Sequence, residues 1–141
     1  MAFREKLAWA LLATTVGGYA VYLLMLRSVT SSAGWDAPVE ALVPALIGMT
    51  ILMIVLAIVG AIVATVSAPQ EAGASDERDL AIRRIGRSRA YGVMISGVCG
   101  IIILAVSGSN MFQAANALVS ILAIAEIVRY GSEAWNYRRG Y

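Results

Sequence analysis

The chain has 141 residues, a length typical of one domain; 60% of them are hydrophobic and only 14% are charged. Soluble domains carry roughly 25% charged residues, so a soluble protein of this size would lack the polar groups to cover its surface. The composition therefore indicates a membrane protein. There is no histidine and one cysteine, Cys99, which excludes disulfides within the chain, multi-thiolate metal sites, histidine-based haem or zinc sites and a histidine general base.

Four apolar segments have the length of membrane-spanning helices, about 17–25 residues. They are residues 7–26, 42–66, 90–106 and 111–128. Between the last two, the Ser-Gly-Ser-Asn sequence of residues 107–110 is typical of a turn. We therefore predict an all-α fold with a single membrane domain over 1–141. It is an integral membrane four-helix bundle whose third and fourth helices form a tight antiparallel hairpin.

Lysine and arginine are distributed unequally among the loops. Ten of the eleven lie in the N-terminal segment, the 67–89 loop or the C-terminal segment, and only Arg27 lies elsewhere. Because basic loops stay on the cytoplasmic side of a membrane, we expect both termini and the 67–89 loop to be cytoplasmic.

The charged segment before the third apolar run has the features of a helix start. Ser75 is a good N-cap, and Asp76 and Glu77 follow where acids favour the helix dipole. Asp79 and Arg83 are spaced i,i+4 for an ion pair. We predict that helix three begins near Asp76 and extends roughly three to four turns into the cytoplasm.

Helix two has two possible starts. Asp36 can cap it, which would place Pro44 inside the helix and produce a kink. Alternatively, the helix begins just before Pro44 and runs straight. The sequence does not distinguish these alternatives.

The same charged segment, with its interleaved acids, is the main candidate for a binding surface. It could determine topology, attract anionic lipid headgroups or dock a cytoplasmic protein. The acids argue against direct binding of nucleic acid, which favours an unbroken basic surface. The candidate residues here are Asp76, Glu77, Arg78, Asp79, Arg83, Arg87 and Arg89.

Polar residues within the apolar runs are the second group of candidates. Gln113, Asn116 and Ser120 share one face of helix four, and this face is expected to turn inward because lipid penalises unpaired amides. They would form hydrogen bonds between helices or, alternatively, line a polar pocket.

Glu126 is the only acid within a predicted span. A carboxylate at this depth needs a partner, so we predict an ion pair with Arg87 or Arg89 of helix three or with its own neighbour Arg129. The alternative is a carboxylate that couples transport to protons.

Small residues recur every fourth position in helix three, at Gly92, Ser96 and Gly100, and in helix two, at Ala57/Ala61 and Gly60/Ala64. This pattern lets helices approach closely in lipid. We expect it to pack inside the bundle; the alternative is a homodimer face.

Several short motifs resemble a group of small four-helix bacterial membrane proteins known mainly as a domain of unknown function. They are Asp76-Glu77-Arg78-Asp79 with Ile82, then Asn116, Glu126 with Arg129 and Tyr130, and the terminal Tyr137-Arg138-Arg139-Gly140. The resemblance covers the second half of the chain. Genes of that group often neighbour short helix-turn-helix regulators, which implies a bacterial inner-membrane protein that partners a soluble regulator.

We therefore predict a non-catalytic membrane protein, with no cofactor and no metal, that binds a soluble cytoplasmic regulator through its charged surface. Membrane lipids are further partners, and a homo-oligomer is possible. The alternative is a small-molecule or ion transporter or channel that acts as an oligomer.

Overall fold

The computed structural model describes residues 3–67 and 77–139. The elements in chain order are α1 (Phe3–Ala33), the short 3-10 helices η1 (Gly34–Asp36) and η2 (Val39–Leu42), α2 (Val43–Ser67), α3 (Glu77–Val106) and α4 (Met111–Arg139). Within these residues, the prediction of an all-helical fold with four helices long and apolar enough to span a membrane is confirmed.

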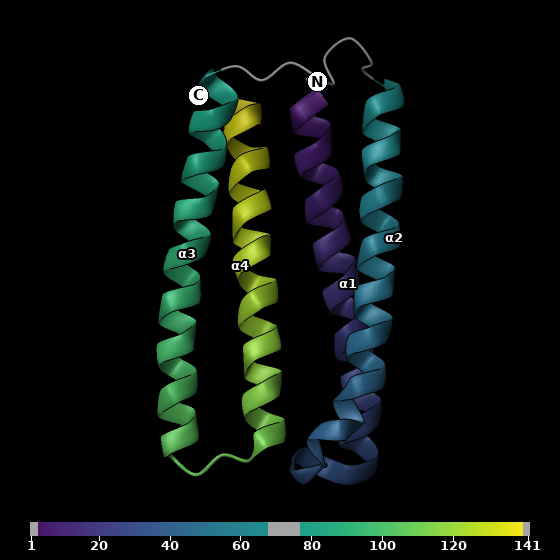
Figure 1. Cartoon of the computed structure of the whole chain (residues 1–141), viewed down its shortest axis with the longest axis vertical. Helices are drawn as coiled ribbons and strands as arrows, with labels where there is room; N and C mark the ends of the chain where they lie inside the picture. Colours follow the sequence, from purple (N-terminus) through teal and green to yellow (C-terminus); the bar gives the residue numbers. More distant parts are fainter. Residues whose placement is uncertain (1–2, 68–76, 140–141) are drawn as a thin grey trace.

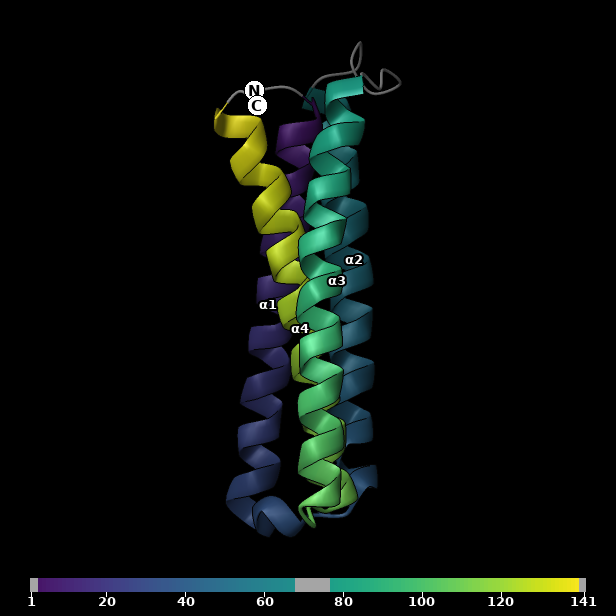
Figure 2. The ribbon, with the colours of Figure 1, turned by 90° about the vertical axis from the view of Figure 1, so that its left-hand side faces the viewer.

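The four long helices lie side by side in the order α3, α4, α1, α2 (Figure 1). Each packs on its neighbour in this order, so α2 and α3 form the two edges of a layer that appears narrower when turned by 90° (Figure 2). One end of the layer carries most of the charge, and we call residues 3–11, 77–91 and 126–139 the charged end. The connections 34–42 and 107–110 lie at the opposite end (Figure 1).

Burial of the helices runs opposite to their hydropathy. In the most apolar 18-residue window of each helix, 28% of the residues are buried in α1, 17% in α4, 6% in α3 and none in α2, and mean hydropathy rises in the same order. Water as solvent would favour burial of the most apolar helix. The layer instead places the most apolar helices at its edges.

The chain turns from α1 into α2 through the two 3-10 helices. Gly34 has φ +73°, a conformation that glycine adopts without strain. α2 begins at Val43, so Pro44 lies in its first turn, where its missing N–H costs no helical hydrogen bond. The helix therefore begins just before Pro44, and the alternative with Pro44 inside a longer, kinked helix is wrong.

At the opposite end, a small core and the side chain of Asn110 join the two connections to each other. The Asn110 side-chain oxygen accepts a hydrogen bond from the Gln113 backbone N–H at 2.8 Å and so caps α4. The Asn110 side-chain amide donates to the Trp35 carbonyl and to the Asp36 carboxylate, both at 2.9 Å. The buried core beside it consists of Tyr22, Leu26, Ala37, Leu42, Ala45 and Phe112. The turn between α3 and α4 is thereby tied to the connection between α1 and α2.

Glycines mark where helices approach closely, but only partly in the predicted pattern. A Cβ built on Gly97 would lie 2.5 Å from Ile121 Cγ2, so α3 meets α4 there. A Cβ on Gly92 or Gly100 would meet nothing within 4 Å among the described residues, and Ser96 is exposed. The expectation that the stripe of helix three packs inside the molecule is therefore wrong.

The small residues of helix two do pack against a neighbouring helix. A Cβ on Gly60 would lie 3.1 Å from Ala10 Cβ of α1, and Ala64 is only 2% exposed. The expected packing is therefore observed at these two positions of α2.

Candidate functional site: the charged end

The charged end is built where the first turns of α3 cross the last turns of α4. Ile82 and Gly86 are buried at this crossing. A Cβ on Gly86 would lie 3.0 Å from the Arg129 carbonyl oxygen and 2.8 Å from Glu133 Cγ. The absence of a side chain at Gly86 therefore lets α3 seat directly against the α4 residues that carry the charges.

Arg129 lies at the centre of this arrangement. Its Nη1 is 3.2 Å from Glu126 Oε2, and its Nε is 3.5 Å from Glu133 Oε1. The two acids differ in environment, because the Glu126 side chain is 44% exposed whereas the Glu133 side chain is only 8% exposed. One guanidinium thus joins a partly exposed carboxylate to a buried one.

The predicted pairing of Glu126 with helix three is wrong, and the third option, its neighbour Arg129, is observed. Glu126 turns toward α1 and α2, where it lines a groove with Thr15 and Met53. Tyr130, one turn further along α4, hydrogen-bonds to it. Among the described residues, Glu126 therefore forms its ion pair within α4 and not with an arginine of α3.

Those arginines lie against the last turns of α4 instead. Arg89 donates to the Ser132 hydroxyl at 3.3 Å. The positive charges of Arg83 and Arg87 both favour the ionised form of the Glu133 carboxyl and so lower its pKa. Glu133, two turns beyond Glu126, therefore takes the role of the acid that faces helix three.

Two groups beyond the apolar run 111–128 have altered acidity. Burial raises the pKa of the Glu133 carboxyl, and the attraction of Arg129 offsets this only in part. Burial and a hydrogen bond to Asp79 raise the pKa of Tyr137 to about 12. Asp79 also lies 3.9 Å from Arg4, so α1, α3 and α4 meet at this carboxylate.

A cavity of about 80 Å³ lies among these groups, between α1, α3 and α4. Arginine, tyrosine and carboxylate side chains line it on two sides, and apolar residues of α1 form the third. The lining residues are Arg4, Leu7, Ala8, Leu11, Arg83, Arg129, Tyr130, Glu133 and Tyr137.

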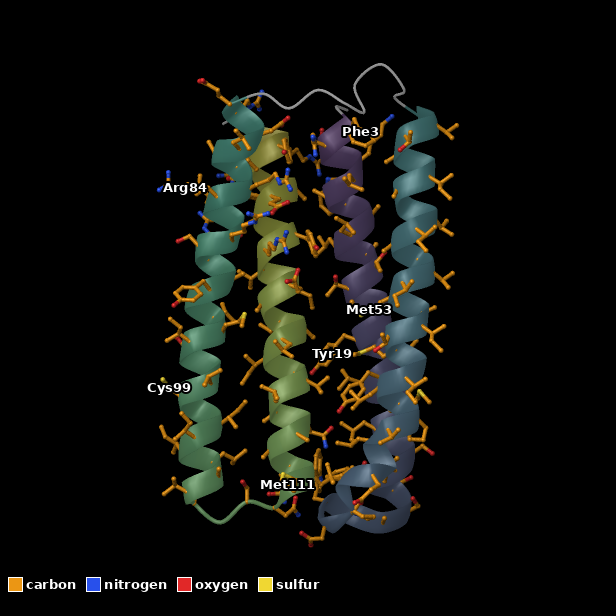
Figure 3. All side chains as sticks on the ribbon, viewed as in Figure 1. Phe3, Tyr19, Met53, Arg84, Cys99 and Met111 are labelled. Atoms are coloured by element: carbon orange, nitrogen blue, oxygen red, sulfur yellow. The ribbon has the colours of Figure 1, made fainter. Side chains whose placement is uncertain are left out.

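The structure separates the predicted site residues into distinct places. Glu77, Arg78, Arg87 and Arg89 are exposed, whereas Asp79 and Arg83 are partly buried. Arg84, which we had not singled out as a binding residue, points away from α4 (Figure 3). Ser75 and Asp76, and hence the predicted cap and start of helix three, lie outside the described residues.

Asn116 does not belong to the charged end. It lies 13 residues before Arg129, about 20 Å along α4. Its side-chain oxygen accepts a hydrogen bond from the Tyr22 hydroxyl at 2.5 Å, and its amide donates to the Phe112 carbonyl at 2.8 Å. The buried amide is therefore used to join α4 to α1.

Four contributors to the charged end were not among the predicted site residues. Arg4, Gly86, Glu133 and Tyr137 meet there through tertiary contact. The available signal was the spacing of Glu126, Glu133 and Tyr137, which places all three on nearly one face of a helix. Among the described residues, no cluster of three or more Cys, Asp or Glu side chains could hold a metal ion.

Comparisons of the chain with protein-family models, with curated proteins and with solved structures found no match.

Proposed function

We propose that the protein is a multi-pass protein of the bacterial inner membrane that binds a soluble cytoplasmic partner and catalyses no reaction. The inverse relation between burial and hydropathy supports the membrane setting, because lipid rewards exposure of the most apolar helices. The ten basic residues gathered at the charged end support a cytoplasmic location for that end.

The observation that carries the binding function is the division of the first turns of α3 into two faces. The inner face, with Ile82 and Gly86, is buried against the neighbouring helices. The outer face exposes Leu80, Arg84 and Arg87, which are spaced i, i+4 and i+7, and Leu80 is 58% exposed. A basic face that includes an exposed apolar residue suits a partner whose surface is acidic around an apolar contact.

The resemblance to small membrane proteins encoded beside helix-turn-helix regulators suggests which partner to test. A short regulator of that kind from the same genome is the first candidate. In this proposal the membrane protein holds the regulator at the membrane surface through the outer face of α3.

The orientation can be tested first with single cysteines placed in a Cys99→Ser background. A membrane-impermeant maleimide applied to intact cells should label Ala33→Cys, at the opposite end, and leave Ser88→Cys unlabelled until the cells are permeabilised. Labelling of Ser88→Cys from outside would reverse the orientation and remove the cytoplasmic partner.

The binding can be tested by co-purification of the candidate regulator with the membrane protein in mild detergent. Arg84→Glu should reduce recovery at least tenfold, because an attractive contact becomes repulsive. Arg27→Glu is the matched control, since Arg27 is also exposed but lies at the opposite end of α1. Equal recovery with all three proteins would contradict docking on α3.

Transport is the second candidate, because the partly exposed Glu126 lines a groove between α1, α2 and α4. A carboxylate at the edge of a span is a common element of ion and proton pathways. Proton flux in liposomes that disappears with Glu126→Gln, while the fold is retained, would favour transport over docking.

A further inference from the structure

The cavity at the charged end is lined by a buried ion pair. Glu133 Oε1 and Arg129 Nε are 3.5 Å apart, a separation at which they form an ion pair and not a well-aligned hydrogen bond. Glu133 is only 6% exposed and lines the cavity. Buried polar atoms are nearly always paired in native proteins, so this cavity is suited to a polar group from outside the chain.

The charges around the cavity define that group. Its lining contains three guanidinium groups, from Arg4, Arg83 and Arg129, and the carboxylate of Glu133. Two further carboxylates lie outside the lining, where Asp79 pairs with Arg4 and Glu126 pairs with Arg129. Arginines in this number favour a phosphate or another oxyanion. The carboxylate requires in addition a donor, which a hydroxyl-bearing headgroup supplies. At roughly 30 Å³ per water, 80 Å³ holds two to three waters or one phosphate group.

An apolar groove lies next to the cavity along the layer. Leu11, Arg129 and Tyr130 line both the cavity and a neighbouring hollow of about 340 Å³ between α1, α2 and α4. Thr15, Met53 and Glu126 line both this hollow and the next one, of about 240 Å³. The three spaces therefore lie in a row, which we call the path, from the charged end toward the middle of the helices, where Tyr19 and Met53 lie (Figure 3).

The groove has the length of one leaflet and apolar walls. From Tyr130 to Val119 it follows α4 for 11 residues, about 16 Å, which is close to half of a hydrocarbon core of about 30 Å. The hydroxyls of Thr14 and Thr15 donate to carbonyls of α1 itself, at 2.9 Å each, so they leave no unpaired donor in the groove. Glu126 lies at the junction and is ion-paired with Arg129.

We propose that this path is a binding site for one molecule of an anionic phospholipid with a hydroxyl-bearing headgroup, such as phosphatidylglycerol. The phosphate lies in the cavity against the three arginines, and a headgroup hydroxyl donates to Glu133. One acyl chain follows the groove between α2 and α4. The site is distinct from the outer face of α3, so it stands or fails independently of the proposed partner.

The test uses the whole protein purified in a mild detergent, with native mass spectrometry to count bound lipids. Phosphatidylglycerol should be retained as one molecule per chain and bind at least tenfold more tightly than phosphatidylethanolamine or phosphatidylcholine with the same chains. Equal binding of all three lipids would overturn the proposal, because the arginine cavity would then select nothing.

Two matched pairs of variants locate the site. Arg83→Gln should weaken phosphatidylglycerol binding at least tenfold, whereas Arg84→Gln, one residue away on the outer face, should change it less than twofold. Ala57→Phe fills the groove and should reduce binding in the same way, whereas Ile58→Phe, which is exposed outside the groove, should not. Circular dichroism and size-exclusion profiles establish that each variant is folded.

The other occupants give different results. If inorganic phosphate protects the protein from thermal unfolding as well as the lipid does, and Ala57→Phe has no effect, the cavity binds a free anion and the lipid site is refuted. If lipid binding is absent and Ala57→Phe converts a dimer into a monomer, the groove holds a second copy of the chain and the proposal is wrong. Equal losses for Arg83→Gln and Arg84→Gln would reduce the effect to general surface charge.

Discussion

The close approach of α3 and α4 at Gly97 can be tested by adding one methyl group. In Gly97→Ala, the new Cβ would lie 2.5, 2.7 and 2.8 Å from three atoms of Ile121. Carbon atoms pack at about 3.5–4.0 Å, so the side chain or the helix must move by about 1 Å. Overpacking of this kind costs about 1–3 kcal/mol.

Gly92→Ala is the matched control, because it lies on the same helix five residues earlier and its Cβ meets nothing within 4 Å among the described residues. Both substitutions gain the same helix propensity, at most about 1 kcal/mol. Gly97→Ala should therefore be less stable than Gly92→Ala by about 1–3 kcal/mol. The free energy of unfolding can be measured by titration with SDS in mixed micelles, followed by tryptophan fluorescence.

A compensating substitution tests the contact itself. Ile121→Ala removes all three atoms that the new methyl group would meet. The double variant Gly97→Ala/Ile121→Ala should therefore lose about 1 kcal/mol less than the sum of the single losses. Strict additivity, or equal stability of Gly97→Ala and Gly92→Ala, would refute the packing of α3 on α4 at this position.

Three further predictions concern the polar contacts. Tyr22→Phe and Asn116→Ala should each lower the free energy of unfolding by about 1 kcal/mol, and the double variant should show a coupling of similar size, because the two side chains share one buried hydrogen bond. Arg129→Gln should cost about 3 kcal/mol since it removes the ion-pair partner of the buried Glu133, whereas Glu126→Gln should cost less than about 1 kcal/mol because that pair is partly exposed; similar losses in the same SDS titration would contradict the central role of Arg129. Tyr137, with a pKa of about 12, should remain protonated at pH 11, so that the ultraviolet titration of tyrosinate in Tyr137→Phe should lack a late step that the unchanged protein shows.

The number and type of the helices follow from the sequence because uninterrupted apolar runs and one turn signal define them. The order of the helices across the layer does not. A helix in lipid can be apolar on every side, so hydrophobic periodicity no longer identifies its buried face. Gly92, Gly97 and Gly100 illustrate the difficulty, since all three are glycines of one apolar run and only Gly97 meets the neighbouring helix.

The location of the charged end could be predicted from the sequence, but the contacts within it could not. The clustering of basic residues located it, whereas the identity of the buried acid depended on how α3 crosses α4. Glu126 attracted attention because it interrupts an apolar run, and Glu133 did not because it stands among other polar residues. Glu133 is the acid that becomes buried because α3 approaches α4 closely where Gly86 meets Arg129 and Glu133. The spacing of residues along one helix does not show which of its faces a neighbouring helix will cover.

The layer can also be considered as two hairpins that meet along a single seam between α1 and α4. α2 is held mainly by α1, and α3 mainly by α4. The two hairpins share a polar contact toward each end, the Tyr22–Asn116 hydrogen bond between α1 and α4 and the ion pair between Arg4 of α1 and Asp79 of α3. In a bilayer, apolar contact between two helices is hardly more favourable than apolar contact between each helix and lipid. Directional polar contacts therefore contribute most where two units must keep a fixed register. Loss of either contact should therefore loosen one hairpin from the other while each hairpin remains intact, because the contacts of α1 with α2 and of α3 with α4 do not depend on the seam.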